Sequence, residues 1–325
     1  MKAVCIERYG GPEVLVYREV PVPQVPSGHV LIRVATTNVN YADVHTRSGV
    51  YRRGETFPFI PGLEAAGTVV EVGKDVQGLE IGQRIVAFSA QGSYSEFMLA
   101  RASLTYVLPD TLSFEAVAGL TAAVTAENIL QHIGLLTRED TILIHAAAGG
   151  VGSLCVQLSK LYGAKQIIAT AGSDEKIAFA KRLGAHHVIN YRHKDFAEQV
   201  YELTAASGAD LILDSVGGEI SAKSVQCLSD FGRLVVFGQA SGVPGHVETA
   251  QLYKQNKRVL GYSSGHFRKT RPEVLRPAAE AILEHLRAGT LEIIVGTTLP
   301  LRDAAEAHRL VESRQIIGKV ILVPE

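Results

Sequence analysis

The run IHAAAGGVGS at residues 144–153 consists mostly of small residues and contains no acid. Small residues allow a backbone turn to approach a ligand closely. The spacing Ala147-x-Gly149-x-x-Gly152 follows the fingerprint of dinucleotide-binding turns, with alanine in place of the first glycine. In that fingerprint, the helix after the turn offers unpaired N–H groups to a pyrophosphate. We therefore interpret this run as a phosphate-binding turn; the alternative is a loop that only packs a helix close to a sheet.

Polar residues after the next two predicted strands indicate which dinucleotide the turn would hold. NAD-binding domains place Asp or Glu at the end of the second strand, where it binds the ribose 2′-hydroxyl. Here the strand predicted at residues 165–170 leads to Ser173 and Lys176, and the following strand leads to Tyr191 and Arg192. Hydroxyl and ammonium groups accept a 2′-phosphate, which a carboxylate would repel. The pattern predicts NADPH rather than NADH as the cofactor.

Strands and helices alternate around the glycine-rich turn. A short apolar strand is predicted over residues 141–145, and apolar residues from Val151 to Leu161 recur at helical spacing. The runs HHVINY, ADLILDSVG and GRLVVFG are predicted as further strands. Ser173 is the expected N-cap of the next helix, and Gly184 is its expected end. This alternation predicts a parallel sheet covered by helices on both faces.

The N-terminal third of the chain has a different pattern, with the short β-like runs HVLIRVATT, AAGTVVEVG, QRIVAFS and SYSEFMLA. The C-terminal segment contains two predicted helices, at residues 273–288 and 303–313, and a last strand, GKVILVP. We interpret this segment as a return to the first domain. The prediction is an α/β protein: a β-rich catalytic domain of residues 1–122 and 266–325, with a nucleotide-binding domain of residues 123–265 inserted in it.

The composition excludes several classes of protein. Hydrophobic residues make up 46% of the chain and charged residues 20%, which is ordinary for a globular protein with a sizeable core. The net charge of −1 argues against nucleic acid or an anionic membrane as the main partner. Cys5, Cys155 and Cys227 are far apart, which argues against a disulfide framework. With no signal peptide and no membrane-spanning apolar run, a soluble cytoplasmic protein is expected.

Four motifs resemble those of the medium-chain dehydrogenase/reductase superfamily: NVNYADVHTRSGVY, IPGLEAAGTVVEVG, GQRIVAF and HAAAGGVG. The resemblance covers essentially the whole chain and implies a GroES-like catalytic domain with an inserted Rossmann domain. Metal-dependent members carry a cysteine in the first motif and Gly-His-Glu in the second. This chain has Asn40 in place of the cysteine and Gly62-Leu63-Glu64 in the second motif. Because an asparagine amide is a poor Zn²⁺ ligand and leucine is none, no metal is expected.

Among the zinc-free members, the chain is most similar to the NADPH:quinone oxidoreductases, also called the zeta-crystallin group. The runs INYR, DSVGG and VVFGQASG are typical of this group. The resemblance implies a homodimer, a 2′-phosphate pocket from Lys176, Tyr191 and Arg314, and Thr125 near the nicotinamide, with Thr121 as its rival. The residues expected to bind NADPH are Thr125, Ala147, Gly149, Gly150, Val151, Gly152, Ser173, Lys176, Tyr191, Phe237, Gly238 and Arg314.

Hydride transfer to a quinone or a similar electron-poor carbonyl requires little acid–base chemistry from the protein, because the cofactor carries the reactivity. The site must orient a flat apolar acceptor and donate hydrogen bonds to the oxygen that gains negative charge. Asn40, Tyr41 and Tyr51 are the expected catalytic donors. Asp43 is expected to brace the loop, because a carboxylate would oppose the developing oxyanion. His45 stands where this group often has tyrosine, so a different acceptor pocket is expected.

Other interpretations of the same residues remain open. Tyr41 and Tyr51 are equally well explained as half-buried aromatic side chains without a chemical role. An NADPH-dependent enoyl-thioester or other enone reductase is the nearest alternative function, because in those relatives a tyrosine at the position of Tyr51 donates a proton. Arg52 and Arg53 would then suit the phosphates of a CoA ester. A non-catalytic role, as a crystallin-like or RNA-binding protein, is the third; the near-neutral charge argues against RNA.

Overall fold

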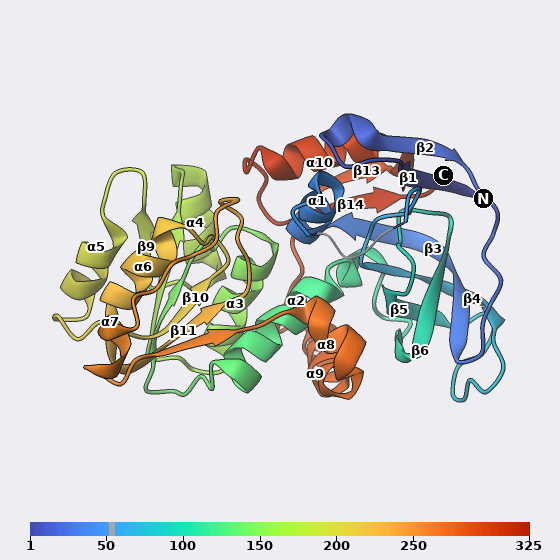
Figure 1. The fold of residues 1–325 in the computed structure, drawn as a ribbon. Coiled ribbons are helices and arrows are strands. Elements are labelled where there is room, and N and C mark those ends of the chain that lie inside the picture. Colours follow the sequence, from blue (N-terminus) through green and yellow to red (C-terminus); the bar gives the residue numbers. More distant parts are fainter. Residues whose placement is uncertain (52–55) are drawn as a thin grey trace. The chain divides into compact units, whose positions relative to one another are not determined.

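The structure, a computed structural model, describes residues 1–51 and 56–325 (Figure 1). The chain divides into two compact units. Residues 1–124 and 267–325 form one of them, called the split unit here, and residues 125–266 form the other, called the inserted unit. Arg52 and Arg53 lie outside the described residues. In the part of the chain that is described, no helix is long and apolar enough to cross a membrane.

A six-stranded sheet in the order β13-β14-β3-β4-β5-β6 forms the framework of the split unit, and β3 also pairs with β6. Alternate residues of a strand point to the same face, and here one face is apolar: Val30, Ile32 and Val34 pack with Val69 and Met98 in a buried cluster. β1 and β2 pair separately. The strands are β1 (Lys2–Ile6), β2 (Leu15–Glu19), β3 (His29–Val39), β4 (Glu64–Val72), β5 (Arg84–Ser89), β6 (Phe97–Val107), β13 (Val295–Pro300) and β14 (Lys319–Val323).

A six-stranded parallel sheet in the order β12-β11-β10-β7-β8-β9 forms the inserted unit. All residues of β7 are buried, as is typical of a central strand in a parallel sheet. This order is that of a doubly wound dinucleotide-binding sheet, so the predicted fold class is confirmed. β12 was not predicted, because it is short and mostly exposed. The strands are β7 (Thr141–Ile144), β8 (Gln166–Ala171), β9 (His187–Asn190), β10 (Ala209–Asp214), β11 (Leu228–Val236) and β12 (Arg258–Gly261).

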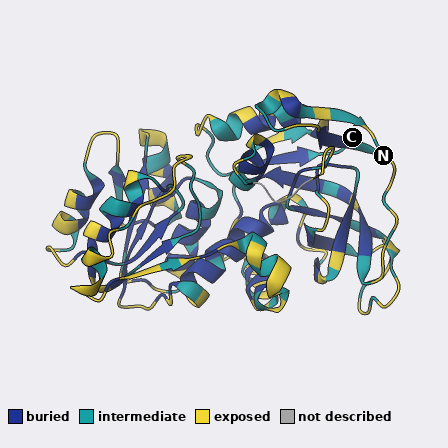
Figure 2. Cartoon of the chain, viewed as in Figure 1, coloured by how far each residue is buried: buried dark blue, intermediate teal, exposed yellow. Residues whose placement is uncertain are grey.

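The helices connect these strands, and many of their outward-facing residues are exposed while the strands are largely buried (Figure 2). The helix predicted at 273–288 consists of a 3₁₀ turn (Pro272–Val274) followed by α9 (Leu275–Arg287), and the helix predicted at 303–313 is α10 (Ala304–Glu312). The other helices are α1 (Tyr41–Ser48), α2 (Leu120–Glu127), α3 (Gly150–Leu161), α4 (Asp174–Leu183), α5 (Phe196–Leu203), α6 (Glu219–Gln226), α7 (Ala250–Tyr253) and α8 (Ser264–Thr270).

Helix α4 begins and ends at the predicted residues. The hydroxyl oxygen of Ser173 accepts a hydrogen bond from the backbone N–H of Lys176 at 3.4 Å, which caps the first turn. Gly184 follows the last turn with a φ of 120°, in a region of backbone conformation that favours glycine. The positions of Ser173 and Lys176 relative to β8 are therefore determined by ordinary helix capping.

Candidate active site

The glycine-rich turn joins β7 to α3, which begins at Gly150. Its N-cap, Gly149, has no side-chain atom with which to cap the helix. A Cβ atom on Gly152 would lie 2.3 Å from the carbonyl oxygen of Ala146, so only glycine lets the helix pack this close to the turn. A Cβ atom on Gly149 would come no closer than 3.3 Å to the same oxygen. The turn thus carries no side chain at Gly149 and leads into a helix N-terminus whose first N–H groups have no intrahelical partner, which suits a phosphate.

The other predicted cofactor residues of the inserted unit follow the ends of neighbouring strands. Ser173 comes after β8, Tyr191 after β9, and Phe237 with Gly238 after β11. Because the carboxyl ends of parallel strands meet at one edge, the structure brings these residues to the same edge as the turn after β7. The N–H of Phe237 donates to the carbonyl oxygen of Asp214 at 3.0 Å, which ties the end of β11 to the end of β10. This edge has the composition of a dinucleotide site.

A hydroxyl group and two cations gather beyond β8 and β9. A Cβ atom on Gly172 would lie 2.6 Å from the hydroxyl oxygen of Tyr191, so the tyrosine lies over this turn. Burial lowers the pKa of Lys176; the charge of Glu175 acts to raise it, and the charge of Arg192 acts to lower it. Two cations this near to each other favour an anion beside them. Arg192 was not among the predicted cofactor residues, although its place directly after Tyr191 was a usable signal.

The predicted donors of the split unit gather around α1. Asn40 is its N-cap, and the Asp43 carboxylate accepts a hydrogen bond from the backbone N–H of Asn40 at 2.8 Å, which forms a capping box. This contact is the bracing role expected of Asp43. The ring centroid of His45 lies 4.9 Å from that of Tyr41 and 4.8 Å from that of Tyr51. His45 therefore links the two tyrosines into one aromatic group.

A buried lysine contacts the side chain of Asn40. Lys319 begins β14, which pairs antiparallel with β3 so that Val320 lies opposite Val39. The Nζ atom of Lys319 donates to Oδ1 of Asn40 at 2.7 Å, and the lysine is 5% exposed. Nδ2 of Asn40 is buried and has no hydrogen-bond partner among the described residues. The contact with Lys319 thus occupies the acceptor end of the amide only, and the donor end is buried without a partner among the described residues.

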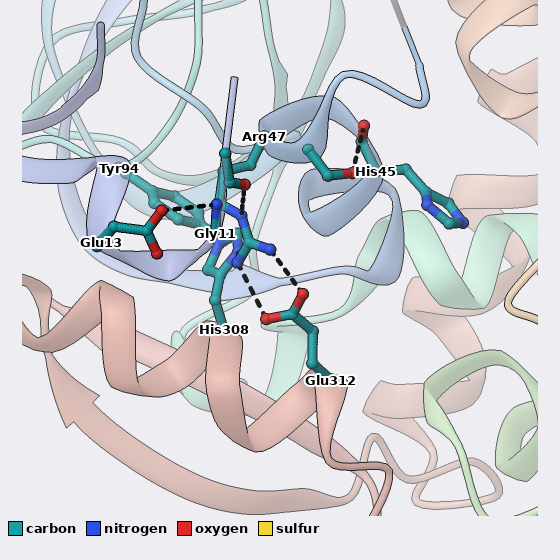
Figure 3. Close-up of polar contacts among 9 residues, drawn as sticks. Gly11, Glu13, His45, Arg47, Tyr94, His308 and Glu312 are labelled. Atoms are coloured by element: carbon teal, nitrogen blue, oxygen red, sulfur yellow. Dashed lines mark hydrogen bonds and ion pairs between the residues drawn. The ribbon is translucent and has the colours of Figure 1, made fainter. Parts of the chain in front are cut away.

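An ion pair between the buried Arg47 and the partly exposed Glu312 joins the last turn of α1 to α10 (Figure 3). Arg47 is 2% exposed and donates to Glu312 from Nη1 at 3.1 Å and from Nη2 at 2.6 Å. Nη1 also lies 3.3 Å from Nδ1 of His308, whose Nε2 lies 3.2 Å from the hydroxyl of Tyr94. Burial and the Arg47 charge lower the pKa of His308 to about 3. Burial and the Asp43 charge raise the pKa of Tyr94. These contacts hold α1 in place behind its N-terminus.

The residues at the zinc-ligand positions do not fit a zinc ion. Leu63 has no ligand atom, and the only side-chain oxygen of Asn40 accepts from the ammonium of Lys319, a cation that would repel Zn²⁺. Both carboxylate oxygens of Glu64 are bonded, one to Nδ2 of Asn38 at 2.8 Å and one to a backbone N–H of α2 at 2.7 Å. Within residues 1–51 and 56–325, no three His, Cys, Asp or Glu side chains gather closely enough to hold a metal ion.

Two further predicted cofactor residues lie on other elements. Thr125 is a buried residue of α2, one turn after its rival Thr121, whose backbone N–H bonds to Glu64. Arg314 belongs to the split unit, follows α10, and is exposed with a φ of 55°. The structure therefore gathers the predicted cofactor residues that follow β7, β8, β9 and β11 at one edge of the inserted unit, and the donors around α1 within the split unit.

Two protein families and many individual proteins are similar to this chain. The family description "alcohol dehydrogenase GroES-like domain" matches residues 26–110, and "zinc-binding dehydrogenase" matches residues 150–280. A 2-haloacrylate reductase from a Burkholderia species is 34% identical over 332 residues, and a quinone oxidoreductase from Pseudomonas aeruginosa is 34% identical over 330 residues. Each alignment covers 99% of this chain and 99% of the relative. The solved Escherichia coli quinone oxidoreductase complexed with NADPH is 32% identical, with a TM-score of 0.92 and 100% of both chains covered.

Proposed function

The chain belongs to the medium-chain dehydrogenase/reductase family, within its quinone oxidoreductase group, and we propose that it transfers hydride from NADPH to a quinone or a similar electron-poor carbonyl without zinc. One observation carries the proposal, and it concerns Asn40, which stands where metal-dependent relatives hold a zinc-binding cysteine. The side-chain oxygen of Asn40 accepts a hydrogen bond from Lys319. Its side-chain nitrogen is buried without a partner among the described residues. A hydrogen-bond donor at that point suits an acceptor oxygen.

NADPH supplies a hydride at its nicotinamide ring when it is bound. The turn at Gly149 to Gly152 would hold the pyrophosphate at the N-terminus of α3. Ser173, Lys176 and Tyr191 would hold the 2′-phosphate, and the charge of Arg192 beside Lys176 supports this assignment. The full set proposed to contact the cofactor is Thr125, Ala147, Gly149, Gly150, Val151, Gly152, Ser173, Lys176, Tyr191, Arg192, Phe237, Gly238 and Arg314.

The residues around α1 would bind the acceptor. Tyr41, His45 and Tyr51 form an aromatic group that suits a flat, apolar ring. Asn40 would donate through Nδ2 to the oxygen that gains negative charge, with Tyr41 and Tyr51 as further donors. The protein's contribution is then orientation and electrostatic stabilisation, and no side chain has to act as a base.

We propose further that the split unit is the catalytic domain, that the inserted unit binds NADPH, and that the protein is a cytoplasmic homodimer. All three cysteines are free and buried, which suits a reducing compartment. Phe231, Tyr253 and Val259 are exposed apolar side chains of the inserted unit on or near its outer strands, which suits a dimer contact there. Light scattering of the purified protein tests the dimer.

A reductase of activated carbon–carbon double bonds is the second candidate, since a 2-haloacrylate reductase is among the relatives and Tyr51 stands at the position of a proton donor. NADPH oxidation with a 1,2-quinone and with crotonyl-CoA, measured for the wild type and for Tyr51→Phe, separates the two. Quinone turnover that survives Tyr51→Phe supports the proposal. A preference for the thioester that is lost with Tyr51→Phe contradicts it, and NADPH binding without any turnover favours a non-catalytic role.

A further inference from the structure

Lys319 is a charged side chain at the start of an apolar strand. Val320, Ile321 and Leu322, which follow it in β14, are all fully buried or nearly so. Lys319 itself is 5% exposed, with the two buried carboxylates of Glu64 and Asp43 as the nearby negative charges. Burial lowers the pKa of this lysine, while both carboxylates act to raise it. Burying a charge is costly unless specific contacts compensate it. Nζ of Lys319 donates to the carbonyl oxygen of Val39 at 3.5 Å and, more closely, to Oδ1 of Asn40 at 2.7 Å.

The contact with Oδ1 determines how the amide of Asn40 is oriented. An ammonium carries only donors, so the Asn40 atom 2.7 Å from Nζ of Lys319 must be the carbonyl oxygen. The antiparallel register of β14 and β3 brings Lys319 to Asn40 across 279 residues of sequence. With Oδ1 bonded in this way, Nδ2 points away from Lys319 within the amide plane, and it is buried without a partner among the described residues.

We propose that Lys319 is a positioning residue for the reaction, because its ammonium holds Oδ1 of Asn40 so that Nδ2 presents its hydrogens to the acceptor oxygen that gains negative charge. The inference rests on the proposed function, in which Asn40 is the donor. A cation bonded to Oδ1 also polarises the amide, and this strengthens the hydrogen bond that Nδ2 donates. Without Lys319, the amide is free to rotate and to offer its oxygen to the acceptor, which repels the developing charge.

A purely structural role for Lys319 has a different signature. If the positive charge of Lys319 only balances the carboxylates of Glu64 and Asp43, it stabilises the fold whether or not residue 40 carries an amide. The loss on removing Lys319 would then be the same in any background at position 40. A double-mutant cycle separates these cases. If the two residues act through one contact, the double variant loses no more activity than a single variant; if they act independently, the two losses add.

The experiment measures kcat and KM for a 1,2-quinone with saturating NADPH, the Kd of NADPH, and Tm, in the wild type, Lys319→Met, Asn40→Ala and the double variant. We expect kcat/KM for the quinone to fall about 100-fold in each single variant, and by no more in the double variant than in Asn40→Ala. The Kd of NADPH should stay unchanged. Lys319→Gln, whose amide nitrogen reaches almost as far, should recover part of the loss.

A second readout does not depend on turnover. The side-chain amide resonances of Asn40, assigned by their disappearance in Asn40→Ala, should shift in ¹H–¹⁵N spectra of Lys319→Met. Lys257→Met is the matched control: Lys257 is 8% exposed, its Nζ donates to the carbonyl oxygen of Val225 at 2.9 Å, and it lies in the inserted unit. This control should lower Tm and leave both kcat and the Asn40 resonances unchanged.

The outcomes are distinct. If the wild-type protein reduces no quinone with NADPH, the proposed function itself is contradicted. A wild type that does so, with Lys319→Met equally active or with a Lys319→Met loss that recurs in full on the Asn40→Ala background, overturns the role of Lys319 alone. If Lys319→Met does not fold, Lys319→Gln replaces it in the double-mutant cycle with Asn40→Ala. Losses of kcat/KM that add in that double variant would also overturn the inference.

Discussion

The backbone N–H of Asn40 donates to the carboxylate of Asp43 at 2.8 Å, and Asp43 is 1% exposed. This contact places the first turn of α1, and it is the reason that Asn40 and Tyr41 start the helix where they do. The carboxylate thereby fixes the backbone at the start of α1. Removing it should affect stability and turnover together.

Asp43→Ala should lower the free energy of unfolding by about 1–2 kcal/mol and also lower kcat, because the start of α1 loses the capping-box hydrogen bond to the backbone N–H of Asn40. Denaturant titration and steady-state kinetics measure the two effects. The matched control is Asp195→Ala, which removes the N-cap of α5 in the inserted unit. It should cost similar stability at unchanged kcat. An Asp43→Ala protein with normal turnover would show that the capping box does not position the donors.

Gly152→Ala should damage the phosphate-binding turn. The added Cβ would lie 2.3 Å from the carbonyl oxygen of Ala146, so α3 must shift away from the turn, at a cost of about 1–3 kcal/mol. We expect weaker NADPH binding in a fluorescence titration. Gly261→Ala is the control, because a Cβ there has no heavy atom within 4 Å. Unchanged NADPH affinity in Gly152→Ala would remove this turn from the cofactor site.

Cofactor preference should depend on the two cations beyond β8 and β9. Lys176→Ala and Arg192→Ala should each lower kcat/KM for NADPH about 10-fold while leaving kcat/KM for NADH unchanged, because only NADPH carries the 2′-phosphate. Lys181→Ala, on the same helix, is the control. Equal losses of kcat/KM with NADPH and NADH would mean that these side chains support the fold and do not bind the 2′-phosphate.

Stability should fall in acid because of His308. Its pKa is lowered from 6.5 to about 3 in the folded protein, so between these values the unfolded chain binds a proton that the folded chain does not. The free energy of unfolding should therefore decrease as the pH is lowered from 6.5 towards 3, and His308 contributes about 1.4 kcal/mol per pH unit. Urea titrations of the wild type and His308→Gln at pH 6.5 and 4.5 measure it. Parallel pH dependence in both proteins would contradict this role.

The fold was predictable where short-range signals are strong. The buried strand β7, the glycine turn and the capped helix α4 each carry a pattern that depends on near neighbours only. β12 has no such pattern, because it is an exposed edge strand of four residues. The starts of α9 and α10 lie one or two residues after the predicted ones, because the 3₁₀ turns Pro272–Val274 and Leu301–Asp303 precede the two helices.

The candidate site was only partly predictable. Asn40, Tyr41 and Tyr51 lie in one short segment, so a motif could single them out together. Lys319 could not be found in this way, because its contact with Asn40 depends on strand pairing across 279 residues. The ion pair of Arg47 and Glu312 could not be predicted from the sequence for the same reason. Long-range contacts of this kind leave no periodic pattern in the sequence.

Reduction of a 1,2-quinone by NADPH, measured after exhaustive chelation with the metal content determined on the same sample, tests the central claim most directly. We expect full turnover without bound metal, because in the proposed function Nδ2 of Asn40 donates a hydrogen bond to the acceptor oxygen that a metal ion would otherwise polarise. Turnover that disappears on chelation and returns with zinc would contradict it.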